Sequence, residues 1–226
     1  MHYPPLALRP RIFSMNAAAT IEAPYSEVAL SVNAFDSPEW SRAQPIQITR
    51  TWSGADAPAS RHAEARILRT ADSLLVRFIC GQEEPLIVNS NPQRDVKTLR
   101  LWDRDVCEIF LAPDAKTPGR YFEFEASPLG EWVDLAINFN STGRETDFAF
   151  HSGMTAAALV GKDKITIGME IPWSASLPKP QKGDVWHVNL FRCVGVGDER
   201  YLAWQPTYAR EPNFHVPEVF GQLRFL

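Results

Sequence analysis

Charged side chains interrupt two stretches that otherwise have the apolar pattern of buried strands. Glu108 lies in phase with Val106 and Phe110, and Arg77 stands within the apolar run 73–80 (SLLVRFIC). A charge that is fully buried without a partner is very costly. These two charges must therefore reach water, another charge or a ligand.

Polar residues alternate with apolar ones in two further segments. Glu123 and Glu125 alternate with phenylalanines in 120–127 (RYFEFEAS), and Asn189 alternates with apolar residues in 184–193 (DVWHVNLFRC). Such residues form either a solvated outer face with ion pairs between strands or a concave polar binding face. The second interpretation would place six residues on that binding face: Arg77, Glu108, Glu123, Glu125, His187 and Asn189.

Two of the seven tryptophans stand beside loops and polar residues rather than inside strands. Trp102 precedes the segment carrying Glu108, in LWDRDVCEIF, and Trp204 precedes a proline-rich loop, in YLAWQPTY. By contrast, Trp186 lies within an alternating strand, as a core residue does. A sugar ring offers an apolar face to an aromatic ring and hydroxyl groups to polar side chains. We therefore predict that Trp102 and Trp204 lie close together on one rim, with Glu108 between them.

Catalytic patterns are weaker than this binding pattern. A retaining glycosidase needs two carboxyl groups about 5 Å apart, which Glu108 could form with Glu123 or Glu125 on a neighbouring strand. Alternating glutamates are common on strands without catalysis, and the serines show no G-x-S-x-G motif. We therefore predict a protein that is not an enzyme, with a glycoside hydrolase as the less favoured alternative.

No cofactor is predicted. A haem site would need an axial His or Met pair, but Met169 lies in the apolar phase of its strand and is expected in the core. Asp103, Asp105 or Asp147 could contribute to a structural calcium site, although the sequence has no EF-hand spacing.

Many short strands are needed to position these residues. Eighteen prolines leave few gaps for a long helix, and period-two patterns predict strands over five segments, namely 73–80, 105–111, 120–127, 164–171 and 184–193. Weaker candidates are 27–32, 45–50, 64–70, 131–137, 154–160 and 223–226, with short helical turns at 37–42 and 172–174. We predict an all-β fold, a two-sheet antiparallel sandwich of the immunoglobulin-like or jelly-roll-like kind.

The domain organisation follows from composition. We expect an arm over residues 1–20, poorly ordered, and a single sandwich domain over 21–226, because no linker divides the chain. Three cysteines, Cys80, Cys107 and Cys193, fall in apolar runs and are predicted to be buried and unpaired.

Charge and hydropathy exclude several partners. A net charge of −4 at pH 7 argues against nucleic acid and anionic membranes. No apolar run is long enough to span a bilayer. No signal peptide pattern is visible at the N-terminus, so the chain as written is expected in the cytoplasm, unless a leader was removed.

Three segments resemble the family-9 carbohydrate-binding modules and the wider DOMON-like group of β-sandwiches. They are 35–43 (FDSPEWSRA), 102–110 (WDRDVCEIF), and Trp204 followed by 212–215 (PNFH) and 220–223 (FGQL). The second segment is similar to the family's W-x-x-D-x-V-E-I-F pattern. Together the three segments cover the chain from about residue 30 to its end.

The resemblance implies a non-catalytic domain that holds a mono- or oligosaccharide. In the sugar-binding members two loop tryptophans enclose a terminal sugar, and by position these would be Trp102 and Trp204, with Glu108 accepting hydroxyl protons. Those members carry a basic residue on the next strand, where this chain has Glu123 between two phenylalanines. Family members are often secreted. A DOMON-like module for protein interaction, haem or metal, without a sugar slot, is the alternative.

Overall fold

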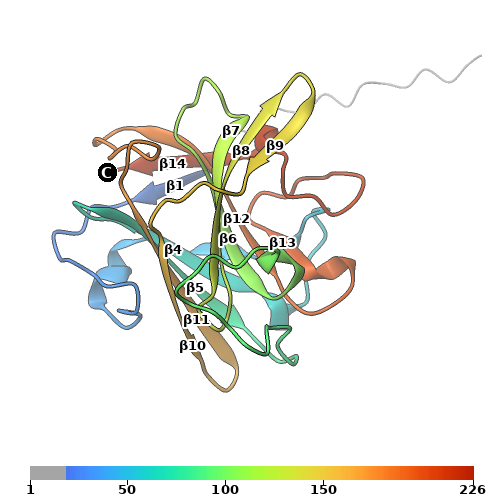
Figure 1. Ribbon diagram of the computed structural model, residues 1–226. Coiled ribbons are helices and arrows are strands. Elements are labelled where there is room, and N and C mark those ends of the chain that lie inside the picture. Colours follow the sequence, from blue (N-terminus) through green and yellow to red (C-terminus); the bar gives the residue numbers. More distant parts are fainter. Residues whose placement is uncertain (1–18) are drawn as a thin grey trace, which may run out of the picture.

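Alternating apolar and polar residues produce two β-sheets that pack face to face in the computed structural model, which describes residues 19–226 (Figure 1). The main path of the nine-stranded sheet runs, in spatial order, through β1 (Thr20–Ala23), β14 (Gly221–Phe225), β12 (Val185–Cys193), β6 (Val106–Ala112), β7 (Arg120–Ala126), β8 (Trp132–Asn140) and β9 (Gly143–Asp147). The same sheet has a side branch on β12, made of β13 (Tyr201–Ala203) and β3 (Arg50–Thr51).

The second sheet has five strands, in the order β10 (Thr155–Val160), β11 (Lys164–Pro172), β5 (Ser73–Gly81), β4 (Ala63–Arg69) and β2 (Ile46–Ile48). Helical structure in the described residues is limited to short 3₁₀ turns, η1 (Pro38–Arg42), η2 (Ala59–Arg61), η3 (Leu101–Asp103), η4 (Asp198–Arg200) and η5 (Pro217–Val219). The predicted all-β sandwich is confirmed. One strand pair departs from the antiparallel pattern, because β1 runs parallel to β14.

The five strongest strand predictions are confirmed within one or two residues, as β5, β6, β7, β11 and β12. The predicted strand at 27–32 is wrong, because this segment consists of bends and turns. The helical turn at 172–174 is also wrong, since β11 extends through Pro172 and a loop follows. Three short strands, β1, β9 and β13, have too few residues to show a period and were not predicted.

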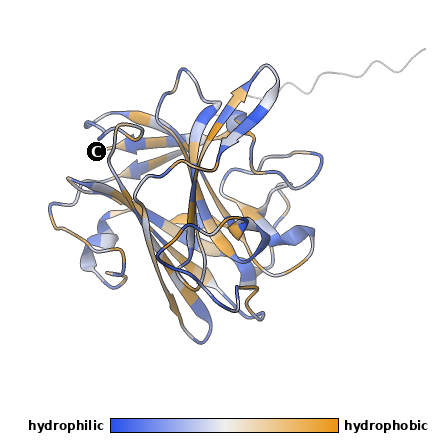
Figure 2. Ribbon diagram, viewed as in Figure 1, coloured by the Kyte–Doolittle hydropathy of each residue, from blue (hydrophilic) through white to orange (hydrophobic). Residues whose placement is uncertain are grey.

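Most of the apolar residues lie between the two sheets. This main core includes Val76, Phe78, Ile109, Leu111, Phe124, Ile167, Val188 and Leu190. Figure 2 shows apolar residues along the strands and hydrophilic residues in the connecting loops. Burying one such large side chain stabilises the fold by roughly 1.5–3 kcal/mol.

A second apolar cluster covers the other face of the nine-stranded sheet. This outer cluster includes Val106, Phe110, Tyr121, Val133, Leu135, Phe191 and Cys193 from the sheet, covered by Leu101, Phe214 and Phe220 from loops. Its sheet residues alternate along the strands with those of the main core. Both faces of the central strands are therefore buried, which explains their nearly continuous apolar sequences.

The three cysteines are free and buried, as predicted. Cys80 of the five-stranded sheet and Cys107 of the nine-stranded sheet meet in the main core, with 3.4 Å between their sulfur atoms. Cys193 lies in the outer cluster.

The expected arm over residues 1–20 lies outside the described residues, except for its last two positions. Thr20 already belongs to β1, where it pairs with Gln222. No helix in residues 19–226 is long and apolar enough to cross a membrane.

Candidate functional site

A pocket of about 370 Å³ opens on the outer face of the nine-stranded sheet. Strand side chains form its floor and two loops form its walls. We call it the outer pocket, and the residues that line it are Trp102, Asp103, Glu108, Phe110, Glu123, Leu135, Arg144, Thr146, Phe148, Cys193, Tyr201, Pro212, Asn213, Phe214 and His215. Its size lies in the range of small-molecule sites.

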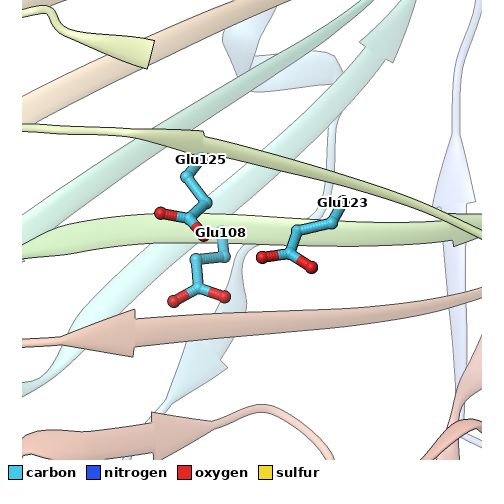
Figure 3. A group of neighbouring side chains, drawn as sticks. All are labelled: Glu108, Glu123 and Glu125. Atoms are coloured by element: carbon cyan, nitrogen blue, oxygen red, sulfur yellow. The ribbon is translucent and has the colours of Figure 1, made fainter. Parts of the chain in front are cut away.

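Three glutamates meet beneath this pocket. Glu108 on β6 is the direct cross-strand partner of Glu125 on β7, and Glu123 lies two residues away on the same face. Figure 3 shows their carboxyl groups gathered together, and one oxygen atom from each lies within 4.8 Å of the others. Glu108 and Glu123 line the outer pocket, whereas Glu125 lies behind them.

Burial changes the acidity of all three groups in the same direction. The side chains of Glu108, Glu123 and Glu125 are 2%, 4% and 0% exposed. Burial, reinforced by the charge of Glu123, raises the pKa of Glu108 to about 8. Burial and the charges of its two neighbours raise the pKa of Glu125 well above its usual range, and burial raises the pKa of Glu123.

Few hydrogen bonds satisfy these carboxyl groups. The thiol of Cys193 donates to Glu108 Oε1 at 3.4 Å. Among the described residues, Glu123 Oε2 and both oxygens of Glu125 accept no N–H or O–H donor, but the carboxyl groups of Glu123 and Glu125 are close enough to share a proton. A buried polar atom without a partner is costly, so these oxygens are available to a ligand or to a shared proton.

The backbone before Trp102 holds its indole at the pocket. Arg100 adopts a left-handed conformation with φ of 61°, which is uncommon for a residue with a side chain. Its guanidinium bonds the carboxylate of Asp103 at 2.8 Å, which closes the η3 turn around Trp102. The indole is half-buried against the outer cluster and lines the pocket.

The loop 212–215 forms the opposite wall. The ring of Phe214 stacks on Phe191 of β12, with 4.0 Å between ring centroids. His215 Nδ1 lies 2.7 Å from the hydroxyl of Tyr121 on β7. Burial lowers the pKa of His215 to about 3, so its ring is neutral at pH 7 and accepts or donates a hydrogen bond without adding charge to the pocket.

The predicted pairing of Trp102 with Trp204 is not what the structure shows. Trp204 does not line the outer pocket, because its ring packs against the main core and over Gly221. A side chain at Gly221 would occupy the same space as the indole. Only one of the two tryptophans therefore reaches the glutamates.

Two other predicted site residues have structural partners elsewhere. Asn189 is fully buried, and its amide bonds the backbone of Gln205 as both donor and acceptor, at 2.9 and 3.0 Å. Arg77 belongs to the five-stranded sheet, where its guanidinium donates to the carbonyl of Phe35 at 2.6 Å and lies over the Trp40 ring. The prediction that Arg77 lies on the same polar face as Glu108 is therefore wrong. His187 does not line the outer pocket either.

The aspartates considered for calcium do not gather. Asp105 is buried, and its two oxygens accept backbone N–H groups of Ile87 and Gly195 at 3.0 and 2.9 Å. Asp103 pairs with Arg100, and Asp147 accepts the backbone N–H of Ala149. Met169, considered for haem, is buried in the main core.

Sequence reasoning missed several residues of the pocket, chiefly Arg144, Tyr201 and His215. Tyr201 lies just before Trp204, and His215 ends the segment 212–215. In the sequence this segment indicates only the resemblance to the family. Arg144 lies on β9, whose sequence GRETD has no apolar alternation. Arg144 supplies a positive charge next to Glu123.

Because the three glutamates are buried, we expect the free energy of unfolding to fall as the pH rises. The pKa of these carboxyl groups is higher in the folded state than in the unfolded state, where it is about 4.3. Their stabilisation of the folded state is therefore fully present below this unfolded-state pKa and is lost as the pH rises toward 8 and above. Relative to Glu108→Gln, the wild type should therefore lose stability by up to about 1.4 kcal/mol per pH unit over this range. Urea unfolding at several pH values measures the difference.

Exposed Glu145 on β9 provides the control, because Glu145→Gln removes the same charge outside the outer pocket. The free energy of unfolding of Glu145→Gln should change with pH in the same way as that of the wild type. Parallel pH profiles for wild type and Glu108→Gln would show that Glu108 is not buried as described.

Comparison with known proteins agrees with this fold. The family model described as "Carbohydrate family 9 binding domain-like" matches residues 33–226. No curated protein is similar enough to this chain to count as a match.

Three solved structures are similar to the chain. A crystal structure from Bacteroides uniformis is 18% identical, with a TM-score of 0.66, and the match covers 93% of this chain and 100% of the other. A family 9 carbohydrate-binding module from Caldicellulosiruptor kristjanssonii in complex with cellotriose is 14% identical, with a TM-score of 0.62 and coverage of 92% and 93%. A module from the same organism in complex with glucose is 16% identical, with a TM-score of 0.58 and coverage of 92% and 96%.

Proposed function

Because this chain belongs to the carbohydrate family 9 binding domain-like family, we propose that it binds a mono- or oligosaccharide in the outer pocket without catalysing a reaction. The observation that carries the proposal is the meeting of Trp102, Glu108 and Glu123 in one open pocket. The two modules from Caldicellulosiruptor kristjanssonii are complexes with cellotriose and glucose, which supports the same ligand class.

The pocket offers the two kinds of surface that a sugar ring needs. The C–H face of the ring would pack on Trp102, and Tyr201 offers a second aromatic wall in the place first assigned to Trp204. Glu108, Glu123, Arg144 and Asn213 line the same pocket and can bond hydroxyl groups. With hydrogen bonds of about 0.5–1.5 kcal/mol each and the cost of association, a dissociation constant in the micromolar to millimolar range follows.

The carboxyl groups support binding rather than hydrolysis. A glycosidase needs one protonated and one ionised carboxyl group, whose pKa values are driven apart. Here burial raises the pKa of Glu108, Glu123 and Glu125 together. This common direction does not give the opposed shifts that distinguish a catalytic acid from a catalytic base.

The purified protein should therefore release no aglycone from chromogenic glycosides and no reducing sugar from oligosaccharides. The measurement compares wild type with Glu108→Gln over several hours at pH 5 to 8. Activity in the wild type that disappears in the variant would establish a glycoside hydrolase instead.

Titration calorimetry against a panel of mono- and disaccharides, with and without calcium, tests the proposed function. We expect saturable binding of at least one sugar, with one site per chain. If no sugar binds at millimolar concentration in either condition, the proposed function is wrong.

A further inference from the structure

In residues 19–226, no arginine or lysine forms an ion pair with the three glutamates beneath the outer pocket, although Arg144 lies near Glu123. Arg200 is already bound to backbone, since its two Nη atoms donate to the carbonyls of Asp103 and Arg104. Arg144 is exposed at the pocket rim. A buried carboxyl group is either protonated or paired with a cation, and a cationic ligand would supply the partner that the ionised form needs.

The acceptor geometry fits an ammonium group. An ammonium carries three N–H donors and no acceptor, and charge-assisted N–H···O bonds are about 2.7–2.9 Å long. Three oxygens that surround one such nitrogen therefore lie about 4–5 Å apart. One oxygen each from Glu108, Glu123 and Glu125 lies within 4.8 Å of the others, so the cluster is no wider than this arrangement. Glu123 lines the pocket and is 4% exposed, and its Oε2 atom has no hydrogen-bond donor within reach, with His215 Nε2 at 3.9 Å.

The rest of the pocket indicates an organic cation rather than a bare metal ion. A calcium ion needs six to eight oxygen ligands, and the walls here are the aromatic rings of Trp102, Tyr201 and Phe214. Aromatic faces attract organic cations and pack against sugar rings. The volume of about 370 Å³ is also that of a small-molecule site.

We propose that the outer pocket prefers a sugar that carries a primary amine, with its ammonium group bound to Glu108 and Glu123 and with Glu125 beneath them. This inference rests on the proposed function and names the class of sugar. The sugar ring would then lie against Trp102, and the positive charge of Arg144 would remain at the rim.

Binding of an ammonium should also release protons. Burial favours the protonated carboxyl groups, and an adjacent cation favours the ionised ones. The other titratable or charged groups around the three glutamates are Tyr121, His215, Cys193, Asp103, Arg144 and Arg200. Burial keeps Tyr121, His215 and Cys193 uncharged near pH 7, so released protons come from the carboxyl groups.

Calorimetric titration with glucosamine, glucose and N-acetylglucosamine at pH 7 tests the inference, in two buffers of different ionisation enthalpy. Glucosamine should bind at least about tenfold more tightly than the two neutral sugars and should release protons. Glu123→Gln should reduce this preference to about onefold, while Glu145→Gln should retain it. Circular dichroism and thermal unfolding check that both variants are folded.

Each outcome decides one claim. Equal affinity for glucosamine and glucose would overturn the inference and leave the proposed function standing. A preference for glucosamine that survives Glu123→Gln would also overturn it, because the amine would then bind elsewhere. Tight binding of calcium chloride alone that is lost in Glu123→Gln, with no preference for glucosamine, would show a metal site instead. Absence of binding by all three sugars and by the wider panel would remove the proposed function as well.

Discussion

Replacing Arg192 by methionine should lower the free energy of unfolding by about 3–5 kcal/mol. Arg192 on β12 is 2% exposed, and its guanidinium reaches from the nine-stranded sheet to the start of β4 and the end of β5 in the other sheet. It donates to the carbonyls of Arg61, His62 and Gly81 at 2.7, 2.9 and 2.7 Å, and to Gln82 Oε1 at 2.9 Å. Methionine fills part of the space but leaves these buried acceptors without donors.

Urea unfolding monitored by tryptophan fluorescence measures this loss. Arg210→Met is the matched control, because Arg210 is exposed and its replacement should change stability by less than about 0.5 kcal/mol. Equal stabilities for the two variants would mean that the link between the sheets contributes little.

Replacing Trp102 by alanine should weaken sugar binding by at least about tenfold, or 1.4 kcal/mol. The indole is half-buried and is the tryptophan that lines the outer pocket. Its loss removes an apolar wall for the sugar ring, but it removes only a partly buried side chain from the outer cluster. The fold should therefore persist, with a far-UV circular dichroism spectrum like that of the wild type.

Trp204 provides the comparison for Trp102, since both lie close to a strand and both are half-buried. Trp204→Ala should cost more stability than Trp102→Ala, because the half-buried Trp204 ring packs against the main core and over Gly221. The variant that remains folded should keep its affinity for sugar. A large loss of affinity in Trp204→Ala, with Trp102→Ala unaffected, would contradict the assignment of the wall to Trp102.

Much of the architecture follows from local patterns. Period-two alternation and frequent prolines are properties of short segments, so they predicted the central strands and the sandwich. Glu108, Glu123 and Glu125 could be placed on one face because their strands are consecutive and their phases are visible. The hairpin β8–β9 and its Arg144 could not be predicted, since GRETD has neither apolar residues nor a period.

The errors concern relations between distant segments. Whether Arg77 shares a face with Glu108 depends on which sheet each strand joins, and strand order is not visible in one sequence. Trp102 and Trp204 have similar local surroundings, yet only the tertiary structure places Gly221 beneath one of them. Asn189 has a polar side chain in the correct phase, but the loop at Gln205 uses its hydrogen bonds.

A crystal structure of the protein with its tightest-binding sugar tests the central claim most directly. We expect one sugar ring in the outer pocket, against Trp102, with hydrogen bonds to Glu108 or Glu123. A sugar bound with full occupancy at another surface, with the outer pocket free of ligand, would contradict it.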